Sequence, residues 1–61
     1  TLKQNAYYNS GNVLFNLGKL EQAIDSYKKA LELDPNDLDT KYNLEFCVYL
    51  FFNCVNNLLR F

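Results

Sequence analysis

The chain has 61 residues, of which 49% are hydrophobic, and its six basic and seven acidic side chains give a net charge of −1. This length allows one small domain, and chains this short bury too little apolar surface to be comfortably stable without a staple or a partner. A charge close to zero gives no attraction to nucleic acid or to anionic lipid, so we expect no nucleic-acid partner.

The first predicted helix covers about residues 4–17, where apolar side chains recur on one face at helical spacing. Gly18 ends this helix. A second, amphipathic helix begins at Leu20 and is closed by the only proline, Pro35. Because the connection between them is so short, we expect an antiparallel helical hairpin.

A third predicted helix extends from Leu38 to Phe61, a stretch without glycine or proline. Asn36 or Asp37 can cap its first turn. Asparagines are poor helix formers, so a bend near Asn53 is the alternative to one continuous helix. No strand pattern competes with this all-α interpretation.

Residues 4–37 resemble one tetratricopeptide repeat, a helical hairpin of about 34 residues with small and large side chains at fixed places. The matching positions are Tyr7, Gly11, Leu14, Ala23, Tyr27, Ala30 and Pro35. Ser10 departs from the pattern, which usually has leucine there. Independently of the family, Gly11 and Ala23 are small enough to let two helices approach closely, with larger side chains around that contact.

One period later the pattern restarts with Leu44 at the leucine site and Val48 at the large site, but Glu45 replaces the glycine. A carboxylate at a close helix contact would be crowded and desolvated, so a second complete hairpin is not expected. We therefore predict a single all-α domain over residues 1–61, with one repeat at 4–37 and a capping-like C-terminal helix at 38–61, in an alpha-alpha superhelix type of fold.

The resemblance also implies an aromatic concave surface that binds a partner helix or peptide. Its residues would be Tyr8, Asn12, Phe15 and Asn16 from the first helix, with Tyr42, Phe46, Tyr49 and Leu50 from the third. Asn12 and Asn43 fit the groove asparagines of relatives that grip acidic C-termini of chaperones. Tyr8 stands where those relatives have lysine, so we reject that carboxylate clamp.

No charged residue occurs between Phe46 and Leu59. In this segment and just before it, Leu44, Val48, Phe51, Val55 and Leu58 step by four and three residues, which is the pattern of a helix-pairing stripe. We expect the first turns of this stripe to cover the hairpin and the last turns to extend past it.

Leaving the apolar side chains of the last helix in water would forgo on the order of 10 kcal/mol, which is comparable with the stability of a whole domain. We therefore expect self-association into a homo-oligomer through Phe52, Val55, Leu58 and Leu59. The alternatives are the peptide- or helix-binding groove, and a fragment of a longer repeat array, which the first residue, Thr1 rather than Met, also suggests.

Other chemistry is not predicted. Histidine is absent and there is no phosphate-binding glycine loop, so we expect no enzymatic activity, cofactor, metal or small-molecule substrate.

Cys47 and Cys54 are about 10.5 Å apart on one helix, too far to form a disulfide with each other. The uncharged segment is too short and too rich in asparagine for a membrane span, so a membrane partner is not favoured. The cellular compartment cannot be read from the sequence.

Overall fold

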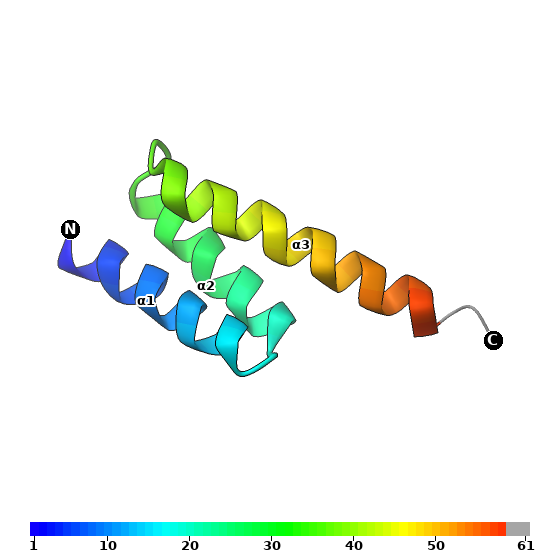
Figure 1. The fold of residues 1–61 in the computed structure, drawn as a ribbon. Coiled ribbons are helices and arrows are strands. Elements are labelled where there is room, and N and C mark those ends of the chain that lie inside the picture. The colour runs from blue at the N-terminus through cyan, green and yellow to red at the C-terminus, as the bar shows by residue number, and fades with distance from the viewer. Residues whose placement is uncertain (59–61) are drawn as a thin grey trace.

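The computed structural model describes residues 1–58, which form three α-helices and no strand. Helix α1 spans Leu2–Asn16, α2 spans Leu20–Leu33 and α3 spans Leu38–Leu58. Helix α2 lies between α1 and α3, and it packs against both (Figure 1). The all-α fold class, with a hairpin followed by a long third helix, is confirmed.

The ends of α1 are set by short-range hydrogen bonds. The Thr1 hydroxyl accepts a hydrogen bond from the Gln4 backbone N–H, so α1 begins two residues earlier than predicted. At the other end Gly18 has a φ of +78°, the left-handed conformation that favours glycine. The N–H groups of Gly18 and Lys19 bind the carbonyls of Phe15 and Leu14, which closes the helix in a Schellman motif.

Asp37 joins the start of α3 to the start of α1. Its carboxylate accepts hydrogen bonds from the side chains of Gln4 and Thr40, both of which are buried. The hydrogen bond from the Thr40 hydroxyl is the main cause that lowers the pKa of the Asp37 carboxyl below its usual 3.8. Asp37 therefore stays charged at neutral pH and satisfies two polar groups that would otherwise be costly to bury.

The core lies where all three helices meet. Ala23, Tyr27 and Cys47 are fully or almost fully buried there. Gly11 allows the close approach of α1 and α2, because a Cβ added to it would lie 2.5 Å from the Tyr27 ring. A close helix approach at Gly11 was predicted, and the structure shows that the Tyr27 ring lies against this glycine. This contact positions the Tyr27 hydroxyl toward α1.

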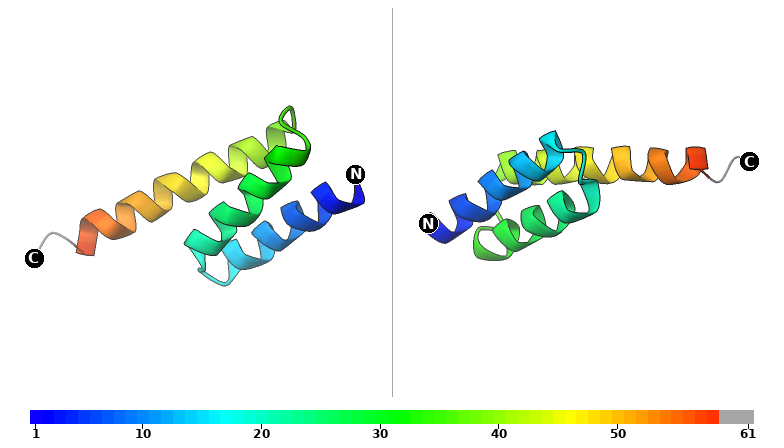
Figure 2. Two further views of the ribbon diagram at one scale, coloured as in Figure 1. Left: turned by 180° about the vertical axis from the view of Figure 1, so that it is seen from behind. Right: turned by 90° about the horizontal axis from the view of Figure 1, so that it is seen from below.

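Helix α3 is continuous through Asn53, as predicted. Its contact face differs from the predicted stripe by one residue, because Cys47 is fully buried whereas Val48 is 40% exposed. Thr40 and Cys47 are small and lie seven residues apart, so α3 approaches α2 along these two side chains rather than along the larger valine. The distal turns of α3 project past the hairpin (Figure 2).

Candidate protein-binding site

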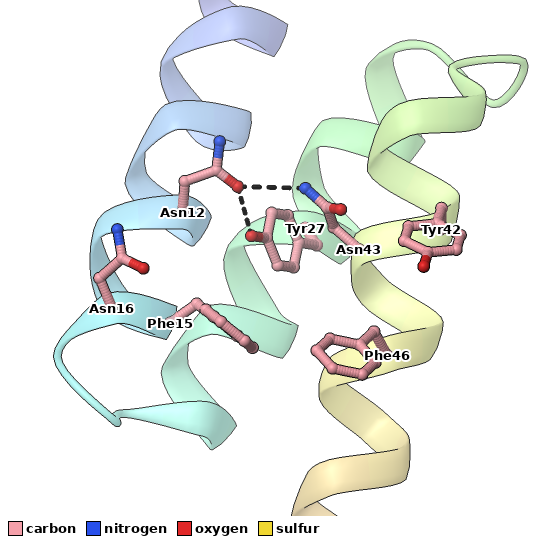
Figure 3. A pocket seen from close by; sticks show the side chains of 7 residues that line it. All are labelled: Asn12, Phe15, Asn16, Tyr27, Tyr42, Asn43 and Phe46. Carbon is pink, nitrogen blue, oxygen red and sulfur yellow. Dashed lines mark hydrogen bonds between the residues drawn. The ribbon is translucent and has the colours of Figure 1, made fainter.

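A pocket of about 450 Å³ lies between α1 and α3, above the Tyr27 side chain of α2. We call it the α1–α3 pocket, and Figure 3 shows its side chains. Three asparagines, two phenylalanines and two tyrosines line it: Asn12, Phe15, Asn16, Tyr27, Tyr42, Asn43 and Phe46. None of these side chains carries a charge.

A hydrogen-bond network holds one wall of the pocket. The Tyr27 hydroxyl donates to the Oδ1 of Asn12, and the Nδ2 of Asn43 donates to the same oxygen over 3.2 Å (Figure 3). Asn43 also donates to the Tyr8 hydroxyl over 3.3 Å. Burial raises the pKa of the Tyr27 hydroxyl, so this group keeps its proton and stays a donor. Residues of all three helices are thereby locked together.

Two aromatic side chains form the apolar part of the pocket. Phe15 of α1 and Phe46 of α3 have ring centroids 5.9 Å apart and planes inclined at 38°. This geometry is favourable for aromatic pairs. Phe46 nevertheless remains 45% exposed, so part of its ring is available to a ligand. The pocket thus combines amide groups on one side with an aromatic surface on the other.

The structure brings together five of the predicted groove residues in this pocket, namely Asn12, Phe15, Asn16, Tyr42 and Phe46. Tyr8 does not line the pocket, but its hydroxyl accepts a hydrogen bond from Asn43 and its ring centroid lies 6.1 Å from that of Tyr27. The other two predicted groove residues do not line the pocket: Tyr49 is 62% exposed and Leu50 is half-buried.

Tyr27 is the pocket residue that the sequence interpretation assigned to packing alone. A buried tyrosine usually finds a hydrogen-bond partner for its hydroxyl, and this general rule could have predicted a hydrogen bond from Tyr27. Its ring fills the core beside Gly11 while its hydroxyl reaches Asn12. Tyr27 therefore links the stability of the hairpin to the shape of the pocket.

The predicted pairing residues form a separate surface on α3. Phe52 and Leu58 are 65% and 73% exposed, and Val55 is 37% exposed. Together with Val48 we call these residues the distal apolar surface. Leu59, which was predicted to belong with them, lies outside the described residues.

The described residues 1–58 include both cysteines and all seven acidic side chains of the chain. Both cysteines are free thiols, Cys47 in the core and Cys54 exposed. Across this described part of the chain, no cluster of three or more acidic, cysteine or histidine side chains could hold a metal ion. Nor does any helix in that range have the length and hydropathy required to span a membrane.

Comparison with known proteins gives two findings. The family model of the tetratricopeptide repeat matches residues 5–37. The chain is also similar to serine/threonine-protein phosphatase T of Trypanosoma brucei brucei (strain 927/4 GUTat10.1), with 40% identity over 42 residues. That match covers 69% of this chain but 9% of the phosphatase. No solved structure matches the chain.

Proposed function

Because the chain belongs to the tetratricopeptide repeat family, whose repeats are protein-interaction modules, we propose that it binds a partner peptide in the α1–α3 pocket. One observation carries this proposal: the pocket presents amides and a partly exposed aromatic pair from two helices, with volume available for a side chain. Ligand sites commonly combine an apolar surface with a few fixed polar groups in this way. The repeat itself is non-catalytic, and the phosphatase activity belongs to the relative.

The pocket wall supports binding without rearrangement. Asn12, Tyr27 and Asn43 hold one another by hydrogen bonds, and their backbones belong to regular helices. A ligand therefore does not have to order these groups when it binds, which reduces the entropic cost of association.

Peptides selected for binding from a random library displayed on phage test this proposal. We expect Phe46→Ala to weaken the selected peptides by about tenfold or more, because a truncated aromatic anchor often costs more than 1.4 kcal/mol. Tyr49→Ser is the matched control, since Tyr49 is an exposed aromatic on the same helix outside the pocket. Isothermal titration calorimetry measures both variants. Selected peptides that bind Phe46→Ala as well as the wild type would contradict the proposal.

A second candidate function is self-association through the distal apolar surface. It is favoured by the exposure of Phe52, Val55 and Leu58 on a helix segment that carries no charge. Contiguous exposed apolar residues are typical of protein contacts. A second copy of the chain supplies a matching surface without any further partner, and symmetric pairs are the commonest homo-oligomers.

Light scattering at tens of micromolar tests self-association. We expect a mass of about twice the 7.2 kDa chain, and we expect Val55→Asp to return the protein to one chain because a charge on the apolar contact must be desolvated. Asn57→Asp adds the same charge to an exposed neighbouring position and should leave the mass unchanged. A helical wild-type protein that stays at 7.2 kDa would rule out this candidate.

A further inference from the structure

A second open groove lies where α3 passes the start of α2. It has a volume of about 430 Å³, and we call it the α2–α3 groove. Its lining comes from the turn after α1, the first turn of α2 and the distal half of α3: Gly18, Lys19, Leu20, Glu21, Gln22, Phe51 and Cys54. Leu20, Phe51 and Cys54 supply apolar surface, and the two charged side chains are of opposite sign. A charged occupant would lose hydration beside this apolar surface, so the groove suits an uncharged one.

The path of α3 explains why this groove is open. After Gly18 the chain reverses, and α2 packs back along α1. One repeat period of about 34 residues later, the chain reaches Phe52, which lies within the continuous helix α3. The chain therefore does not reverse there, and the distal turns of α3 continue past the hairpin instead of folding back over the groove (Figure 2).

Each copy of the chain thus carries a groove and a projecting segment on the same helix. Val55 and Leu58 are exposed on that segment, one turn beyond the Phe51 and Cys54 that line the groove. When two copies pair antiparallel about a two-fold axis near Cys54, the segment of each copy lies in the groove of the other, with Leu58 beside Phe51. Such a self-complementary contact closes with two copies. Because the overlap is confined to residues 51–58, about 12 Å of helix, the two hairpins lie at opposite ends of the pair.

The charge pattern favours a second copy as the occupant. From Phe46 to Leu59 the chain carries no charge, so antiparallel pairing of two such segments brings no like charges together. Lys19 and Glu21 of the groove are exposed, so they can stay hydrated when an apolar segment lies between them and α3. The chain itself therefore contains a segment with the chemistry that the groove requires.

The available area is sufficient for a specific pair. Specific protein contacts bury at least about 1,000 Å² in total, which is about 500 Å² from each chain. The 61 residues of the chain expose 4675 Å². At the resulting average of about 77 Å² per residue, the residues at 18–22 and 51–58 present about 1,000 Å², and burying half of it on each chain reaches that minimum.

Building on self-association, the second candidate function, we propose that two copies exchange the distal turns of α3, so that the turns of each copy fill the α2–α3 groove of the other. The occupant of the groove is a second copy of this chain. Leu20 of α2 is then part of the contact, whereas pairing through the distal apolar surface alone would not involve it.

Isotope-filtered nuclear Overhauser spectra test the exchange in the wild-type protein. Labelled (¹³C) and unlabelled chains are mixed in equal amounts, at a concentration where light scattering gives the mass of two chains. We expect contacts between chains from the Leu58 methyl groups to the Phe51 ring and to the Leu20 methyl groups. Contacts between chains that involve Val48 and Phe52 but not Leu20 would overturn the exchange.

The variant Leu20→Asp tests the groove separately. An aspartate in the first turn of a helix interacts favourably with the helix dipole, so α2 should keep its helicity. In the filled groove its charge must be desolvated, so we expect the dissociation constant of the pair, measured by analytical ultracentrifugation, to rise at least about tenfold. Leu2→Asp is the matched control, because Leu2 is the first residue of α1, is 90% exposed and lies outside the groove. This control should change the dissociation constant by less than about twofold.

The outcomes separate the exchange from self-association itself. A pair that is dissociated by Val55→Asp and yet tolerates Leu20→Asp overturns the exchange and preserves self-association. A chain that stays at 7.2 kDa overturns both. Contacts from Leu58 to Leu20 within one chain also overturn the exchange. If Leu20→Asp does not fold, the contacts between wild-type chains decide the question.

Discussion

Tyr27→Ala is expected to unfold most of the protein at 25 °C. Truncating a large buried aromatic side chain to alanine costs about 3–5 kcal/mol, and stability of about 0.05–0.15 kcal/mol per residue gives a chain of this length only about 3–9 kcal/mol in total. Tyr27 is 1% exposed and contacts Gly11, Tyr8 and the core cysteine. Its loss leaves a cavity at the point where all three helices meet.

The Tyr27→Phe variant separates packing from hydrogen bonding. It keeps the ring and removes only the hydroxyl that donates to Asn12, so we expect a loss of about 0.5–1.5 kcal/mol. Urea unfolding followed by circular dichroism at 222 nm measures both variants. If Tyr27→Ala unfolds at nearly the same urea concentration as the wild type, Tyr27 is not the centre of the core.

Gly11→Ala should destabilise the protein by about 1–2 kcal/mol, although alanine favours helices by about 1 kcal/mol over glycine. The added Cβ would lie 2.5 Å from Cε1 and 2.6 Å from Cδ1 of the Tyr27 ring. That ring is held by its neighbours and by its bond to Asn12, so it cannot move without disturbing the pocket wall. The larger Gly11→Leu should abolish the hairpin contact.

Two controls identify the cause of this effect. In a Tyr27→Leu background the flexible side chain can yield, so Gly11→Ala should cost less there, which gives a coupling in a double-mutant cycle. Gly18→Ala tests backbone strain alone, since Gly18 has a positive φ and open space around it; we expect about 1 kcal/mol. An increase in stability for Gly11→Ala, as helix propensity alone predicts, would contradict the close contact.

Most of the fold follows from local patterns. Helix spacing, Gly18 and Pro35 indicated the element order, and the small side chains of Gly11 and Ala23 indicated a close contact within the hairpin. Helix spacing and helix ends depend on residues that are one or two helical turns apart, and the spacing within the hairpin is typical of the family. The sequence therefore predicts them. The continuity of α3 through Asn53 was also predicted from the sequence, because no glycine or proline interrupts the helix.

The orientation of α3 was harder to predict. Several faces of α3 carry apolar residues, so size and hydrophobicity do not select one of them. The structure buries Thr40 and Cys47 instead of Val48, since small residues allow a close approach and Asp37 satisfies the threonine hydroxyl. Such a compensated polar burial depends on a three-dimensional partner, which periodicity does not reveal.

The sequence predicted only part of the site, because the site also depends on contacts between helices. The resemblance placed Asn12, Phe15, Tyr42 and Phe46 on one surface, and the structure brings them into one pocket. It also included Tyr49, which is 62% exposed and does not line the pocket. The hydrogen bonds that join Asn12, Tyr27 and Asn43 run between three helices, so the sequence pattern did not predict them.

The most direct test of the proposed binding site is an NMR titration of the wild-type protein with a phage-selected peptide. If the α1–α3 pocket is the binding site, the largest shifts occur at Asn12, Phe15, Asn43 and Phe46, and they are lost in Phe46→Ala. Shifts confined to the distal apolar surface, with the pocket signals unchanged, would contradict the assignment of partner binding to this pocket.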